Sequence, residues 1–170
     1  MITLASPSLA VNDSRSNMTL RMDYVVSTGP RDSIGYVINQ IAARSAHRRL
    51  RNVVFNCHGN TARLQIGWGI TLQHVPLFGR LRGRVDKIWF YSCAVASRRE
   101  GLWFCAEVAK QAQAYVLASP EDQLESRAEE KFGLPFNSLD TFEGKLISFD
   151  RTGRVNWSRT YPSTGEANPS

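Results

Sequence analysis

The sequence is poor in cysteine and has no long apolar run, and these two absences exclude several classes of protein. Its 170 residues include only three cysteines, Cys57, Cys93 and Cys105, too few for a disulfide framework. No apolar stretch approaches the length that spans a bilayer, and residues 1–17 lack the basic start and apolar core of a signal peptide. We therefore expect reduced thiols, no membrane contact, and a cytoplasmic location or export by a signal-peptide-independent secretion system.

Positive charge is in excess, and part of it is clustered. The formal net charge is +6, with arginine clusters at residues 48–51, 80–84 and 98–99. Such clusters can bind nucleic acid or an acidic partner. No aromatic side chains are interleaved with these arginines, and no nucleic-acid-binding motif accompanies them. We therefore interpret the clusters as solvated helix ends and loops, with a nucleic-acid-associated α/β domain as the alternative.

The remaining composition is that of a globular α/β protein. With 42% hydrophobic and 21% charged residues, a chain of this length can bury one core. Helical spacing of apolar residues predicts helices at 32–47 and 101–113, and one or two helical turns at 75–81. Runs rich in β-branched and aromatic residues predict strands at 18–27, 52–59, 85–92 and 114–119. This alternation predicts a mainly parallel sheet with right-handed crossovers.

The two ends of the chain are predicted to differ from its middle. Residues 145–149 and 155–159 flank a glycine turn and predict a C-terminal β-hairpin. The polar residues 1–17 are expected to form a flexible N-terminal arm or a short edge element, and residues 161–170 a flexible tail. Residues 18–160 contain no internal repeat or boundary and are expected to form a single domain.

Two apolar runs each end on a reactive side chain. One run leads into His58 and Gly59, and the second leads into Ser92 and Cys93. Parallel strands that finish side by side place their last residues at the same sheet edge, where ligands bind in open α/β folds. An imidazole beside a thiol activates it and shuttles its proton. Cys93 would attack a carbonyl, His58 would protonate the leaving amine, and the backbone N–H groups of Gly59 and Cys93 would hold the oxyanion.

Structural readings of the same residues weigh against this prediction. A cysteine at a strand end is usually a small buried hydrophobe, and a single histidine is usually structural. Cys57 should point to the opposite face from His58, toward the core. That orientation, and the absence of a close Cys-x-x-Cys or His-x-x-x-His pair, argue against a zinc site. Gly67 and Gly69 are not followed by Gly-Lys-Ser/Thr, so they form no phosphate loop. We expect no metal and no cofactor.

The two blocks resemble the caspase-like (clan CD) cysteine peptidases, whose signature is an apolar block ending in His-Gly and a later one ending in a small residue plus Cys. Papain-like enzymes have the opposite order. Residues 64–69, 91–96 with Gly101, and 114–119 are also similar to small bacterial caspase-like domains. The resemblance spans roughly residues 53–119. It implies a three-layer α/β/α sandwich with a mainly parallel central sheet, and endopeptidase chemistry without a metal or cofactor.

The resemblance also implies how a peptide or protein substrate would be bound. Loops around the dyad would build a P1 pocket, with Ser92 leaving room beside the thiol and Trp68 placed to line the cleft. In several relatives an acidic residue after the next strand selects a basic P1 side chain, and Glu121 and Asp122 stand at about that place. The chain has no evident second-subunit segment or processing linker. The alternative is therefore a catalytically inactive caspase-like domain that binds a protein partner.

Overall fold

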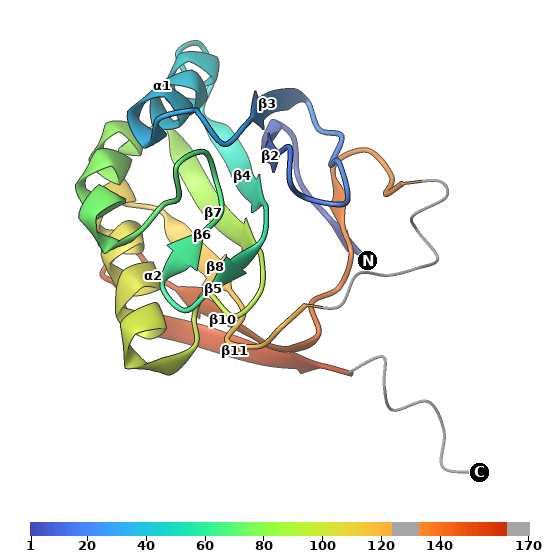
Figure 1. Ribbon diagram of the computed structural model, residues 1–170, viewed down its shortest axis with the longest axis vertical. Coiled ribbons are helices and arrows are strands. Elements are labelled where there is room, and N and C mark those ends of the chain that lie inside the picture. The colour runs from blue at the N-terminus through green and yellow to red at the C-terminus, as the bar shows by residue number, and fades with distance from the viewer. Residues whose placement is uncertain (124–132, 163–170) are drawn as a thin grey trace.

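A seven-stranded sheet forms the centre of the protein in the computed structural model, which describes residues 1–123 and 133–162 (Figure 1). Its strands are β2 (Ser8–Asp13), β3 (Tyr24–Thr28), β4 (Leu50–Asn56), β7 (Val85–Tyr91), β8 (Tyr115–Ala118), β10 (Gly144–Phe149) and β11 (Val155–Tyr161). The order across the sheet is β11-β10-β8-β7-β4-β2-β3. The pairings from β8 to β3 are parallel, and β10 pairs antiparallel with β8 and with β11. The predicted α/β class with a mostly parallel sheet is confirmed.

Three helices and two short strand pairs complete the described structure. The helices are α1 (Ile34–Arg44), the 3-10 helix η1 (Leu72–Leu81) and α2 (Arg98–Ala112). The short pairs are β1 (Ile2–Thr3) with β9 (Ser138–Leu139), and β5 (Gly59–Asn60) with β6 (Arg63–Leu64). None of these helices is long and apolar enough to cross a membrane.

Local sequence explains where the helices lie. The Ser33 hydroxyl caps α1 by accepting a hydrogen bond from the Tyr36 N–H at 3.2 Å. Buried side chains then follow at helical spacing; they are Ile34, Val37, Ile38 and Ile41. The α2 helix ends where Gln113 takes a left-handed conformation, with φ of 50°.

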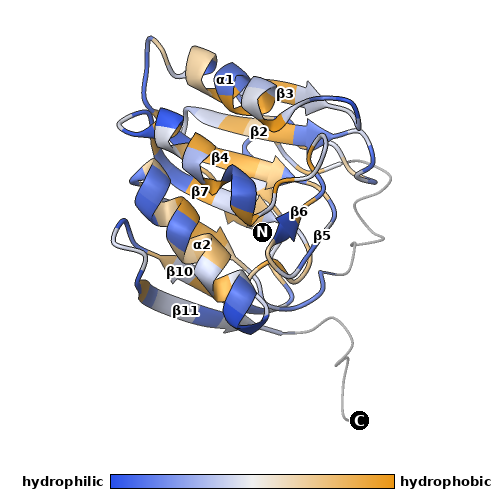
Figure 2. Ribbon diagram, turned by 60° about the vertical axis from the view of Figure 1, so that its left-hand side comes forward, coloured by the Kyte–Doolittle hydropathy of each residue, from blue (hydrophilic) through white to orange (hydrophobic). Residues whose placement is uncertain are grey.

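The described helices pack on one face of the sheet, as Figures 1 and 2 show. This face forms the larger core, in which the Phe90 ring stacks on Phe104 at 5.8 Å and meets the edge of Phe55 at 5.8 Å. The opposite face forms a smaller core, where Trp89 stacks on Phe142. Described segments without helices cover that face, including residues near Leu20 and Leu139. The three-layer α/β/α sandwich therefore stays a prediction.

The N-terminal segment corrects one prediction from the sequence. Residues 1–17 were expected to be a flexible arm or a short edge element, but Ser8–Asp13 is an interior strand of the sheet and every residue in it is buried. The β2 strand pairs in parallel with both β3 and β4. The sequence signal is weak because only Leu9, Ala10 and Val11 are apolar, and the flanking polar residues are buried too. The strand predicted at 18–27 is also shorter than expected, since β3 begins at Tyr24.

Near the C-terminus, the two last strands are joined tightly. The Asp150 N–H donates to the Arg154 carbonyl at 2.7 Å, and β10 and β11 run antiparallel from there. Tyr161, placed at the start of the predicted tail 161–170, is the last residue of β11. Residues 163–170 lie outside the described part of the chain.

Two valines on paired strands test the placement of β2. Val11 is fully buried, whereas Val25 on β3 is 40% exposed. Val11→Ala should lower the free energy of unfolding by about 2 kcal/mol, because it removes buried methyl groups and leaves a cavity. Val25→Ala, the control, should change it by less than about 0.5 kcal/mol. Urea denaturation measures both, and equal small effects would contradict a buried β2.

Candidate active site

His58 and Cys93 lie beyond equivalent points on neighbouring strands. The last registered pair between β4 and β7 is Asn56 with Tyr91, and each of the two residues follows its strand by two positions. The two segments remain adjacent beyond this pair, because the Cys57 N–H donates to the Tyr91 carbonyl at 3.4 Å. The register therefore brings His58 and Cys93 to the carboxyl edge of the parallel strands.

Gly59 brings the two segments into direct contact. A Cβ atom at this position would lie 2.2 Å from the Ser92 Oγ and 3.1 Å from the Cys93 carbonyl oxygen. Any side chain would push the segments apart, so glycine is required by the close approach. The backbones predicted to supply the oxyanion hole, Gly59 and Cys93, thus lie beside each other, and the small Ser92 side chain is buried between them.

The His58 imidazole is exposed and held by one backbone group. Its Nε2 lies 2.9 Å from the carbonyl oxygen of Arg15. A carbonyl oxygen only accepts hydrogen bonds, so Nε2 carries the proton in this contact. In the neutral ring Nδ1 is then the acceptor, which is the form that a general base needs.

The Cys93 thiol is half-buried under another part of its own chain. Its Sγ accepts a hydrogen bond from the Gln123 N–H at 3.4 Å and lies 3.6 Å from the Gln123 carbonyl oxygen, to which it donates. Within the described residues, His58 and Cys93 make no hydrogen bond to each other. The thiol is therefore paired with the backbone N–H and carbonyl of Gln123 rather than with the imidazole.

Gln123 is fixed in that position by its side chain. The amide nitrogen Nε2 donates to the Ser119 Oγ at 2.9 Å and to the carbonyl oxygens of Glu121 at 3.1 Å and Glu143 at 3.2 Å. The amide oxygen accepts a hydrogen bond from the Glu143 N–H at 2.8 Å. Four contacts with the ends of β8 and β10 thus hold the Gln123 peptide on the thiol.

The turn after Cys93 has an unusual backbone. Ala94 and Arg98 both have positive φ angles, 49° and 58°, which non-glycine residues rarely adopt. Gly101 allows α2 to pack on this turn, since a Cβ atom there would lie 2.4 Å from the Val95 carbonyl oxygen. Strained residues of this kind persist where surrounding packing fixes them, and they cluster at functional sites.

The other predicted substrate-binding residues are dispersed around this edge. The Trp68 side chain is exposed, with a relative exposure of 67% for the residue. Its backbone N–H donates to the Asp32 carbonyl at 3.0 Å, near the start of α1. The Glu121 carbonyl accepts the Ala94 N–H at 2.9 Å, which brings residue 121 beside the cysteine turn. The Glu121 carboxylate, however, accepts a hydrogen bond from the Lys145 N–H. Asp122 is exposed.

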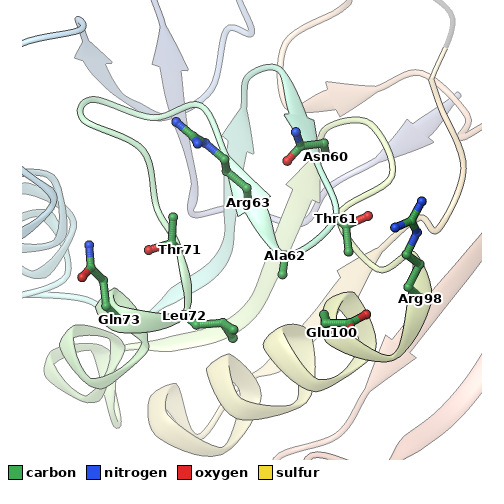
Figure 3. A pocket seen from close by; sticks show the side chains of 9 residues that line it. All are labelled: Asn60, Thr61, Ala62, Arg63, Thr71, Leu72, Gln73, Arg98 and Glu100. Atoms are coloured by element: carbon green, nitrogen blue, oxygen red, sulfur yellow. The ribbon is translucent and has the colours of Figure 1, made fainter.

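An open pocket of about 760 Å³ lies next to these loops, between the β5–β6 pair and the starts of η1 and α2 (Figure 3). The residues that line it are Asn60, Thr61, Ala62, Arg63, Thr71, Leu72, Gln73, Arg98 and Glu100. Neither dyad residue is among them, although Asn60 follows His58 by only two positions. The pocket flanks the dyad and does not contain it.

The remaining thiols and the described acidic and basic groups suggest no other chemistry. Burial raises the pKa of the Cys57 thiol to about 12, and it also raises the pKa of Cys105. Both thiols are free and lie in the core. Among the described residues, no group of three His, Cys, Asp or Glu side chains could hold a metal ion.

The arginine cluster at 80–84 makes contacts within the fold. Arg82 Nε donates to the Gln111 carbonyl at 2.7 Å, near the end of α2, and Arg80 donates to the Asn39 side chain at 3.0 Å. Arginine at a helix C-terminus satisfies free carbonyl groups and the helix dipole. These contacts support the structural interpretation of this cluster.

Three residues around the dyad were missed in the sequence. They are Asp13, which pairs with Arg15, then Arg15 itself, which contacts His58, and Gln123, which contacts Cys93. The first two fall in the segment predicted to be a flexible arm, and Gln123 belongs to no motif. Their contacts join positions 30 to 43 residues apart in the chain, so no local pattern could have shown them.

Thiol alkylation tests the arrangement of the cysteines. Iodoacetamide should label Cys93 faster than Cys57 or Cys105, because the two core thiols are buried and their raised pKa values leave little thiolate. Peptide mapping by mass spectrometry after short exposures gives the order. Equal, slow labelling of all three would show that Cys93 is no more accessible than a core thiol.

A second experiment tests the cover over the thiol. In Gln123→Glu a carboxylate replaces the amide that donates three hydrogen bonds, and this carboxylate faces carbonyl oxygens. We expect Cys93 to be alkylated about tenfold faster, which corresponds to about 1.4 kcal/mol of lost hydrogen bonding. Gln73→Glu, an exposed position, is the charge-matched control and should leave the rate unchanged. An unchanged rate in Gln123→Glu would mean that Gln123 does not limit access.

Comparisons of the chain with protein-family models, with curated proteins and with solved structures find no match.

Proposed function

We propose that the protein is a caspase-like cysteine endopeptidase, in which His58 and Cys93 form the catalytic dyad and no metal or cofactor takes part. The proposal includes the caspase-like, three-layer form of the α/β fold. One observation carries it: the parallel register of β4 and β7 brings both residues to one sheet edge, with Gly59 packed directly on Ser92 and Cys93.

The chemistry follows from the state of the two side chains. The Nδ1 atom of neutral His58 takes the proton of the Cys93 thiol, and the thiolate attacks the scissile carbonyl carbon. Backbone N–H groups of Gly59 and Cys93 stabilise the oxyanion. The imidazolium then protonates the leaving amine as the C–N bond breaks. Water, deprotonated by the imidazole, attacks the thioester and releases the carboxylic acid and the free thiol.

Substrate must displace Gln123 before this reaction begins. The Gln123 backbone contacts Sγ on both its N–H and its carbonyl, and a scissile peptide would have to approach the same sulfur atom. The dyad hydrogen bond can then form as the site tightens around substrate, because catalytic hydrogen bonds in empty sites are often long or absent.

For specificity we propose a basic P1 side chain, bound by the acidic residues after β8. Asp122 is exposed, and the Glu121 backbone contacts the turn after Cys93. The Glu121 carboxylate would have to leave the Lys145 N–H to reach a substrate, so Asp122 is the more available partner.

A second candidate is a catalytically inactive caspase-like domain that binds a protein partner. The observation that favours it is the pairing of the Cys93 thiol with Gln123 in place of His58. In this case the dyad edge serves only as a binding surface.

A peptide library separates the two candidates. Wild-type protein, and more strongly Gln123→Glu, should cleave peptides with Lys or Arg at P1, and Cys93→Ala or His58→Ala should reduce cleavage to the uncatalysed rate, because each removes a reacting group. Cys105→Ala, which removes a buried thiol on α2, is the matched control and should stay active. No cleavage by either wild type or Gln123→Glu would favour the binding module.

A further inference from the structure

Asp13, the last residue of β2, carries a carboxylate with no exposed surface. It accepts hydrogen bonds from the Arg15 guanidinium at 2.7 and 2.9 Å, from the Thr28 hydroxyl at 3.0 Å and from the Gly67 N–H at 3.1 Å. Burial raises the pKa of Asp13, but these hydrogen bonds outweigh it and hold the pKa below its ordinary value. The group is therefore a buried, charged carboxylate that joins three separate segments.

Arg15 extends this connection toward the dyad. Besides its ion pair with Asp13, its Nη2 donates to the carbonyl oxygens of Gln65 at 3.3 Å and Gly67 at 2.8 Å. Its own backbone carbonyl accepts the His58 Nε2–H. The same residue thus links the 65–67 segment to the imidazole.

The segments at Arg15 and at Gln65 both bind His58, one at its ring and the other at its backbone. Its ring contacts the Arg15 carbonyl, and its backbone carbonyl accepts the Gln65 N–H at 2.8 Å. The Asp13–Arg15 ion pair fixes both groups that bind His58, the Arg15 carbonyl and the Gln65 N–H, relative to β2. An ion pair with bidentate geometry gives this kind of directional support.

We propose that Asp13 and Arg15 are positioning residues that hold the His58 ring in place, with Nε2 protonated and Nδ1 free to accept a proton. The inference rests on the proposed function only for its effect on catalysis, since the ring state can be measured without any activity. Neither side chain touches the substrate. Both act through backbone groups, so a change in either side chain alters His58 by moving the Arg15 carbonyl or the 65–67 segment.

The first readout is the long-range proton–nitrogen NMR spectrum of His58, recorded where the ring is neutral. In wild type one fixed tautomer should give two widely separated ring nitrogen signals. In Asp13→Asn and Arg15→Met the separation should narrow, because the two tautomers exchange. Arg15→Lys keeps the charge but loses the bidentate fork, and should fall between wild type and Arg15→Met.

Asp23→Asn is the matched control. The Asp23 carboxylate also accepts several hydrogen bonds, from Ser6, Ser8 and Asn137, and its pKa is also lowered, but it makes no contact with the dyad loops. The control should lose stability in thermal unfolding while the His58 signals stay as in wild type. An unchanged His58 spectrum in Asp13→Asn would overturn the positioning role and leave a purely structural ion pair.

Kinetics give the second readout. Asp13→Asn should lower kcat by about ten- to a hundredfold with little change in KM, because misplacing a catalytic group acts on the transition state. Equal losses in Asp13→Asn and Asp23→Asn would also count against positioning. If neither wild type nor Gln123→Glu cleaves any peptide, the proposed function fails, and the NMR comparison still decides whether Asp13 and Arg15 hold the ring.

Discussion

The parallel pairing of β4 with β7 is the constraint on which the site depends. Its register places His58 and Cys93 at equivalent positions, each two residues beyond the end of its strand. A shift of the register by one residue would turn one of them toward the opposite face of the sheet. Buried side chains on these strands, such as Phe55 and Phe90, fix the register by packing under the helices. The core and the candidate site are thus products of one pairing, and mutations deep in the sheet can shift the side chains at its edge.

Buried polar side chains on β2 and β4 are paired with one another and with nearby segments at the dyad edge. Asn12 and Asn56, neighbours on β2 and β4, bond to each other at 2.8 Å, and Asp13 follows directly. Unpaired polar groups at such depth are costly, so each partner is needed by the other. These paired polar groups explain how a strand with only three apolar residues remains inside a sheet. Asp13 also holds Arg15, whose backbone carbonyl contacts the histidine.

The sequence was informative where the pattern is local. Helical spacing at Ile34, Val37 and Ile41 and the apolar runs of β4 and β7 were sufficient to predict those elements and the sheet type. The ends of two apolar runs were sufficient to predict that His58 and Cys93 lie at one edge of the sheet, where the register brings them. The β2 strand was missed because its polar residues find partners far along the chain, and Gln123 because its contact with the thiol depends on tertiary structure alone. Periodicity reports burial of apolar side chains and says nothing of buried polar ones.

The long-range pairing of β2 also has a consequence for folding order. Ser8 and Asn52 are hydrogen-bonded partners 44 residues apart, and Cys93 meets a partner 30 residues further along. Non-local contacts of this kind form late, since loop closure must precede them. During synthesis the cysteine therefore emerges as an ordinary thiol, and its neighbours at Gly59 and Gln123 gather around it only when the sheet closes. The surroundings of the Cys93 thiol are therefore a property of the finished fold, and the nascent chain carries the thiol without them.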